Sequence, residues 1–187
     1  MKNLIDDLDS IPEMFTDGFR GIMLIRRNKD GGEGNAQRKS IKRISSDTTE
    51  WKAYIRELRD MQLSTHSGHR IYSSLNSRNI NKVIYEFKRR QLDLEAGGLE
   101  EYWNFYIDIE NRFFSSFMNP SAREQKNFLI DCDSDEEYKK AVMQLNGLGL
   151  ILYEYPTKKG MHIITQPFNQ LDFEPMQVKK DDLMFIG

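Results

Sequence analysis

The order of apolar and polar positions is clearest in the last third of the chain. An apolar run at residues 128–130 predicts a buried strand. Helical spacing follows over 134–147, where Ser and Glu three residues apart give the capping-box pattern of a helix start. Two further apolar runs, at 150–155 and 161–165, are separated by a turn-forming Pro-Thr-Lys-Lys-Gly segment. We therefore predict a strand, a helix and a β-hairpin, followed by one apolar strand at the C-terminus.

The pattern of apolar and polar positions in the first two thirds of the chain predicts more helix than the pattern in the last third. Residues 22–25 predict a short strand, and the Gly-, Asn- and Lys-rich segment after them predicts an exposed basic loop. Apolar residues at helical spacing predict a helix over about 48–62. Residues 69–76 alternate as in a strand and lead into a helix with an apolar stripe over 80–87. An aromatic-rich stretch ending before Pro120 predicts a largely buried helix.

Strands mixed with helices, together with a late hairpin, predict an α+β fold with mixed or antiparallel sheets flanked by helices. A chain of 187 residues is long enough for one domain with a substantial core. We expect a single domain over 1–187. Its first part, 1–66, would hold a strand, the basic loop and a helix, and 67–187 would hold the functional core.

Composition narrows the function classes only slightly. With a net charge of −2, any affinity for nucleic acid must come from local clustering of the 27 Lys and Arg residues. The single cysteine, Cys132, excludes an internal disulfide and a multi-cysteine zinc site, and it favours a reducing, cytoplasmic setting. The sequence has no basic leader followed by an apolar run, and no stretch near the roughly 18 apolar residues of a membrane helix. We expect neither secretion nor membrane insertion.

Asp131 and Asp133 stand at the end of the predicted strand over 128–130. Strand side chains alternate between faces, so these two point the same way while Cys132 points to the other side. Two ionised carboxylates so close repel each other unless a cation or a shared proton relieves them. Mg²⁺ or Mn²⁺ prefers such oxygen ligands. Alternatively, Asp133 only marks the strand end, beside acidic residues that suit the helix N-terminus.

The hairpin turn supplies a second candidate site. Gly160 permits close backbone approach to a ligand, Lys158 and Lys159 can neutralise phosphate, and the Thr157 hydroxyl can hydrogen-bond to it. His162, at the second residue of the following strand, can bind a phosphate or a metal, or shuttle a proton. The alternative is a structural histidine behind a turn of ordinary composition.

Taken together, these two features resemble the catalytic core of the archaeo-eukaryotic primase superfamily, over residues 127–169. In that family an apolar-Asp-x-Asp strand supplies metal ligands, a later strand with a Ser/Thr-x-His-like pattern binds the incoming nucleotide, and a further strand supplies a third acid. The resemblance implies that Asp131 and Asp133 hold Mg²⁺ or Mn²⁺ and that His162 belongs to the catalytic and nucleotide-binding residues.

Two positions depart from the family pattern. The family usually places a small hydroxyl residue two positions before the histidine, where this chain has Gly160, whereas Thr157 lies five before it. The third acid has three candidates, Asp172, Asp181 and Asp182, and we include Asp182 among the catalytic residues. These departures are compatible with a minimal, viral or phage type of core, or with a derived relative without activity.

Basic residues supply candidate contacts to nucleic acid. Gathered on one face, they would neutralise phosphates along a template. The strand-to-helix turn after residue 70 also offers helix N-terminal N–H groups to a phosphate, whereas Lys88 to Arg90 suit a solvated helix end. The candidate nucleic-acid ligands are Arg26, Arg27, Arg70, Asn76 and Arg78.

The resemblance implies a divalent-metal-dependent nucleotidyltransferase of the primase or polymerase type. It would use nucleoside triphosphates on a DNA or RNA template in replication, and the replication machinery or a host factor would be its protein partner. Two alternatives stay open. One is a catalytically inactive primase-like module that binds nucleic acid or a host protein, and the other is a metal-dependent nuclease that uses the same acids.

Overall fold

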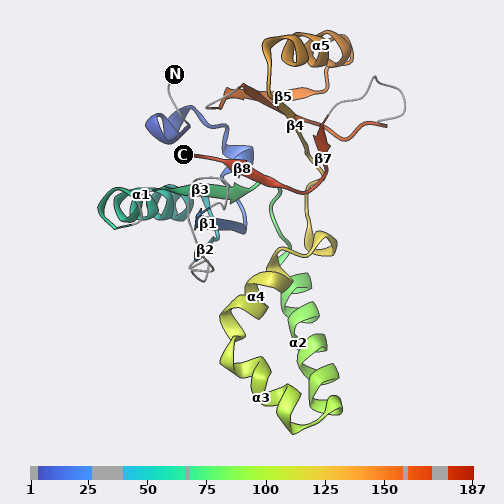
Figure 1. Cartoon of the computed structure of the whole chain (residues 1–187). Coiled ribbons are helices and arrows are strands. Elements are labelled where there is room, and N and C mark those ends of the chain that lie inside the picture. The colour runs from blue at the N-terminus through green and yellow to red at the C-terminus, as the bar shows by residue number, and fades with distance from the viewer. Residues whose placement is uncertain (1–3, 27–39, 66–67, 158–159, 170–176) are drawn as a thin grey trace.

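Two four-stranded antiparallel sheets and a helical arm make up the protein in the computed structural model (Figure 1). The structure describes residues 4–26, 40–65, 68–157, 160–169 and 177–187. Strand order is β2-β1-β3-β8 in the first sheet and β5-β6-β4-β7 in the second. The predicted α+β class is therefore confirmed, and both sheets are antiparallel rather than mixed.

The first sheet is built mainly from the N-terminal part of the chain. Helix α1 begins after Asp47, whose side chain accepts hydrogen bonds from the N–H groups of Thr49 and Glu50. It packs on the sheet through an apolar face, and the Trp51 indole N–H donates to the Ser73 hydroxyl at 2.8 Å. The elements are three short 3₁₀ turns (Leu4–Asp6, Leu8–Ser10, Glu13–Phe15), β1 (Arg20–Arg26), β2 (Ile41–Ser45), α1 (Thr48–Ser64), β3 (His69–Ser74) and β8 (Leu183–Phe185).

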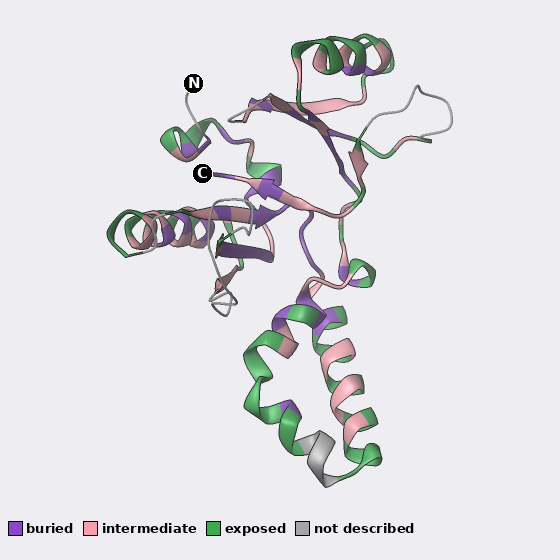
Figure 2. Ribbon diagram, viewed as in Figure 1, coloured by how far each residue is buried: buried purple, intermediate pink, exposed green. Residues whose placement is uncertain are grey.

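The helical arm projects away from both sheets (Figure 1). It consists of α2 (Ile80–Gly97), α3 (Leu99–Ile107), α4 (Ile109–Phe117) and the 3₁₀ turn η5 (Pro120–Ala122). The expectation of one largely buried aromatic helix is wrong. The helix breaks at Asp108, and Trp103 and Ile107 are 68% and 69% exposed, although Phe105, Phe114 and Phe117 are buried. The helices of the arm bury one face against each other, and no sheet covers the outer face (Figure 2).

The second sheet carries the most regular part of the sequence. Its strands are β4 (Phe128–Cys132), β5 (Ile151–Pro156), β6 (Met161–Thr165) and β7 (Val178–Lys179), and helix α5 (Asp135–Asn146) connects β4 to β5. The predicted N-cap is confirmed, since the Ser134 hydroxyl accepts from the Glu137 N–H at 3.2 Å. The Glu137 carboxylate accepts from the Asp133 N–H at 2.8 Å, one residue before the Ser134 N–H that a complete capping box uses. The expected apolar strand at the C-terminus is confirmed as β8, and the polar segment before it contains a further short strand, β7, after which the chain crosses to the first sheet.

The largest apolar core lies between the two sheets. Ile22, Leu24 and Ile71 come from the first sheet, and Leu129 and Ile164 from the second. Burial is accordingly concentrated where the sheets face each other, and the arm is mostly exposed or half-buried (Figure 2). Among the described residues, no helix is both long enough and apolar enough to cross a membrane.

Two sets of polar contacts, Arg78 with Asp181 and Asn76 with Asn127, join the sheets where the chain crosses between them. The Arg78 guanidinium donates to both carboxylate oxygens of Asp181, at 3.0 and 3.2 Å. Asn76 exchanges two hydrogen bonds with the backbone of Asn127, at 2.8 and 3.2 Å, at the start of β4. The expectation that Asn76 and Arg78 contact nucleic acid is corrected here, because both residues are fully buried and the Asn76 amide and the two terminal nitrogens of Arg78 are hydrogen-bonded within the fold.

Replacing Asp181 with Asn should destabilise the protein strongly. The change would leave the fully buried Arg78 without its charge partner, which typically costs about 3–5 kcal/mol in the free energy of unfolding. Glu57→Gln is the matched control, because Glu57 pairs with Arg43 at the surface and such pairs contribute under about 1 kcal/mol. Urea unfolding of the two variants measures both losses. Equal losses of unfolding free energy in the two variants would contradict a stabilising role for the ion pair between Arg78 and Asp181.

Candidate functional site

A cavity of about 360 Å³ lies between the two sheets and is the candidate site. We call it the inter-sheet cavity. It brings together acidic, basic and aromatic side chains from segments far apart in the sequence. The second sheet and its turn contribute Asp131, Asp133, Thr157, His162 and Lys179, the crossing contributes Asp182, and the first sheet contributes Ile25, Arg70, Tyr72, Leu183 and Phe185.

Asp131 is the centre of the polar network. Its Oδ1 lies 3.0 Å from His162 Nε2, and its Oδ2 lies 3.1 Å from Lys179 Nζ. Strand register explains both contacts: Asp131 pairs directly with His162 in β6, and Lys179 in β7 pairs with Leu129, two residues away on the same face of β4. The pKa of Asp131 is well below its usual value, and the hydrogen bond from His162 is the largest cause. Partial burial raises this pKa, but the hydrogen bond from Lys179 lowers it further.

His162 is fixed in orientation by a buried tyrosine. Tyr155 Oη lies 2.8 Å from His162 Nδ1, and the two rings meet edge to face. The Asp131 carboxylate only accepts hydrogen bonds, so His162 Nε2 carries the hydrogen in this contact. Burial raises the pKa of Tyr155 well above its usual value, so the hydroxyl stays protonated. His162 is therefore held in one orientation, with Nε2 donating to Asp131.

Lys179 connects a second acid to this network. Its Nζ lies 3.1 Å from Asp182 Oδ2 as well as 3.1 Å from Asp131 Oδ2. Partial burial opposes the charge of Lys179, but hydrogen bonds to Asp131 and Asp182 and their charges outweigh that effect and raise its pKa. The backbone of Asp182 is held by the Leu75 N–H, which donates to its carbonyl at 3.1 Å. One ammonium group thus bridges two carboxylates.

Asp133 lines the same cavity as Asp131, although β4 ends at Cys132. Its side chain is exposed, while its N–H is fixed by Glu137. Cys132 points to the opposite side and is buried in the cluster against α5. Burial, together with nearby Glu137, raises the pKa of the Cys132 thiol to about 11, so it remains protonated. Strand alternation therefore separates the carboxylates from the thiol.

Thr157, directly after β5, lines one side of the inter-sheet cavity. The Thr157 N–H donates to the Gly160 carbonyl at 2.8 Å, and the Gly160 N–H donates to the Thr157 hydroxyl at 3.2 Å. A Cβ on Gly160 would lie 1.9 Å from the Cys132 carbonyl oxygen. The close approach made possible by this glycine is therefore to the end of β4 rather than to a ligand, which corrects the expectation for Gly160. Lys158 and Lys159 lie outside the described residues.

Arg70 and Tyr72 face the acids from β3 of the other sheet. The Arg70 guanidinium carbon lies 6.0 Å from the centroid of the Phe185 ring, and Tyr72 packs on the same ring at 5.7 Å. The cavity thus has an acidic wall and an opposite wall with a cation and aromatic rings.

The remaining sequence candidates lie elsewhere. Arg26 is exposed and is absent from the cavity lining, and Arg27 and Asp172 fall outside the described residues. Asp181 is used by the buried pair with Arg78, which leaves Asp182 as the later acid beside Asp131.

Sequence reasoning missed Lys179 and Tyr155. Lys179 had a weak signal, since it stands three residues before Asp182, but its pairing with β4 could not be read from the chain.

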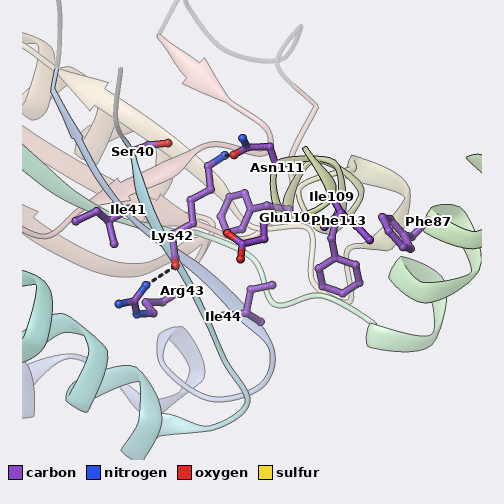
Figure 3. A pocket seen from close by; sticks show the side chains of 11 residues that line it. Ser40, Ile41, Lys42, Arg43, Ile44, Phe87, Ile109, Glu110, Asn111 and Phe113 are labelled. Carbon is purple, nitrogen blue, oxygen red and sulfur yellow. Dashed lines mark hydrogen bonds between the residues drawn. The ribbon is translucent and has the colours of Figure 1, made fainter. Parts of the chain in front are cut away.

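A second cavity, of about 720 Å³, lies between β2 and the arm (Figure 3). It is the larger of the two, but its lining is mainly apolar, with Ile44, Phe87 and Phe113 among the side chains that surround it. Among its lining residues only Glu110 is acidic. The smaller inter-sheet cavity is therefore the better candidate for chemistry.

The donor set of the inter-sheet cavity fits Mg²⁺ or Mn²⁺ by its chemistry. Asp131, Asp133 and Asp182 offer carboxylate oxygens, which both ions prefer. The arrangement is not that of a formed metal centre, because within the described part of the chain no three acidic, histidine or cysteine side chains are gathered closely enough to hold an ion. Lys179 stands between two of the carboxylates, so a cation shared by Asp131 and Asp182 has to displace it.

Gly160→Ala should destabilise the protein, because the new Cβ collides with the Cys132 carbonyl and the turn has to shift. We expect a loss of about 1–3 kcal/mol in the free energy of unfolding, as for other overpacking changes. Gly147→Ala is the control, since a Cβ there meets nothing within 4 Å. Thermal unfolding of both variants measures the effect, and an equal result for the two would contradict the packing role of Gly160.

Acid should remove the stability that Asp131 contributes. A carboxyl with a lower pKa in the folded chain stabilises the fold above its unfolded pKa of about 4, and this contribution is lost as the pH falls toward the folded pKa. Asp131→Asn should therefore lower the free energy of unfolding by about 1–3 kcal/mol at neutral pH, and the difference from wild type should shrink in acid. Urea denaturation over this range checks the trend; a difference independent of pH would contradict it.

Comparison with known proteins adds no relative: no protein-family model, no curated protein and no solved structure matches this chain. The chemistry of the inter-sheet cavity is therefore argued from its own residues. Those residues combine three carboxylates, a fixed histidine, a bridging lysine and an opposing arginine.

Proposed function

We propose that the inter-sheet cavity binds a nucleoside triphosphate and that the protein is a primase-like nucleotidyltransferase acting on a nucleic-acid template. One observation carries this proposal. The Asp-x-Asp end of β4, His162 of β6, Thr157 of the hairpin turn and the later acid Asp182 line one cavity. The sequence motifs that contain these residues lie up to 51 positions apart in the chain, and the fold brings them to one cavity.

Asp131, Asp133 and Asp182 are the candidate ligands of the divalent cation, and they would have to come closer together to hold it. Asp131 and Asp133 come from the end of β4 and Asp182 from the crossing between the sheets. A bound Mg²⁺ or Mn²⁺ supplies charge neutralisation of the triphosphate and activation of the attacking hydroxyl. The protein's own contribution is to keep the carboxylates ionised, which the low pKa of Asp131 favours, and to keep them on rigid elements.

The other residues of the cavity suit the nucleotide. The Thr157 hydroxyl and the Arg70 guanidinium offer donors to a phosphate from two sides, while His162 orients the Asp131 carboxylate beside them. Tyr72 and Phe185 form a ring pair on the wall opposite the acids, a surface on which a base or sugar can pack. The division into an acidic wall and an aromatic, cationic wall matches a ligand that has a charged tail and an apolar ring.

A second function is favoured by the position of Lys179. Because its ammonium already bridges Asp131 and Asp182, the fold can neutralise these acids without a metal ion. A primase-like module that binds nucleic acid or a protein partner, with no transfer activity, is therefore the competing proposal. The two proposals differ in whether Mn²⁺ supports nucleotide incorporation.

The double variant Asp131→Asn, Asp133→Asn should abolish Mn²⁺-dependent incorporation of labelled nucleotides on a primed or unprimed single-stranded template. The loss should exceed the roughly 100-fold effect of disturbing residues that only support a ligand. Asp135→Asn is the matched control, since Asp135 is an exposed residue at the start of α5 outside the cavity lining.

Three other outcomes each point elsewhere. Unchanged incorporation by the double variant would exclude the proposed roles of the two acids. A wild-type protein that binds template without any incorporation would favour the binding module. Loss of labelled single-stranded DNA or RNA without added nucleotide would identify a nuclease that uses the same site.

A further inference from the structure

Lys179 occupies an unusual place for a lysine beside proposed metal ligands. Its Nζ is equidistant, at 3.1 Å, from one carboxylate oxygen of Asp131 and one of Asp182. Asp131 lies in β4 and Asp182 lies in the crossing from β7 to β8. The lysine ammonium binds both carboxylates, which would otherwise repel each other. Its charge is placed where a cation shared by these acids would be placed.

We infer that Lys179 is the resident counter-cation of the inter-sheet cavity, and that a divalent cation binds there by exchange with its ammonium group. This inference rests on the proposed function, since it concerns how the same acids take up their metal. Metal binding then has two parts: the ammonium leaves Asp131 and Asp182, and the metal ion neutralises the two carboxylates in its place.

The surroundings of Lys179 allow such an exchange. Its side chain is 41% exposed, and it stands on β7, a two-residue strand at the edge of the second sheet that pairs only with β4. The ammonium can therefore leave the acids without unpacking the core. Asp131 keeps its other hydrogen bond, from His162 to Oδ1, so the carboxylate stays oriented while Oδ2 changes its partner.

Exchange also couples the metal to the triphosphate. A displaced ammonium in this cavity needs a new anionic partner, and a phosphate group of the nucleotide supplies one. Metal and nucleotide should therefore strengthen each other's binding, and by linkage the effect is equal in both directions. A site without the lysine would lose part of this coupling and would bind the metal alone more tightly.

Mn²⁺ binding by the purified full-length protein tests the inference, measured by titration calorimetry and by the spectroscopic signal of free Mn²⁺, without nucleotide. We expect Lys179→Met, which removes the charge and keeps the apolar stem, to bind Mn²⁺ about tenfold more tightly than wild type. Without metal, the same variant should melt at a lower temperature. Lys180→Met is the matched control, because Lys180 is the exposed neighbour and does not line the cavity.

Lys179→Gln replaces the Met variant if the latter does not fold, since it keeps a hydrogen-bonding group without the charge. Adding a non-hydrolysable nucleoside triphosphate gives the second arm. The analogue should tighten Mn²⁺ binding to wild type more than to the variant.

The outcomes separate the inference from the proposed function. Equal Mn²⁺ affinity of wild type and Lys179→Met would overturn the exchange and leave the nucleotidyltransferase proposal standing. If the variant binds Mn²⁺ while wild type does not, even with nucleotide, Lys179 is a permanent counter-cation; the exchange and the transferase proposal both fall. Binding by neither protein would also overturn both. Tighter binding by the variant, with coupling to nucleotide in wild type, supports both.

Discussion

The ion pair between Arg78 and Asp181 holds the crossing between the two sheets, which lies next to the inter-sheet cavity. Arg78 stands before the helical arm, and Asp181 stands in the crossing from β7 to β8. Because Arg78 is fully buried and the Asp181 side chain is only 9% exposed, separating them carries a large desolvation cost, and the crossing is held in one place. Asp182 and Lys179, one residue after and two before Asp181, are positioned through this constraint. A structural salt bridge is thus placed next to the proposed chemistry.

Charge balance is the second constraint on the cavity. Three carboxylates line it; Lys179 compensates the charge of Asp131 and Asp182, and His162 adds a hydrogen bond to Asp131. Tyr155 fixes the histidine from behind, so the network extends from the buried core to the open cavity. The same balance supports a metal-dependent reaction and a metal-independent binding site. The ammonium of Lys179 decides between them, since it either gives way to a divalent cation or stays.

The helical arm and the first sheet show where local patterns were insufficient. The aromatic spacing over α3 and α4 predicted burial, but only the base of the arm packs on the first sheet among the described residues, through Phe117 beside Ile44, so much of the remaining aromatic surface is exposed. Asn76 and Arg78 have polar side chains beside a helix start, which suited a phosphate contact. Their burial follows from the meeting of three segments that are distant in sequence, a property that no local window contains.

The sequence by itself determined the elements that depend on neighbours along the chain. The apolar run and the capping box predicted β4 and α5, and alternation along the strand placed Asp131 and Asp133 on one side and Cys132 on the other. Tertiary structure alone decided which later acid joins them, that Gly160 packs on β4, and that Lys179 and Tyr155 complete the network. The physical reason is strand register: contacts across a sheet join residues tens of positions apart, and only the packed sheets fix which residues meet.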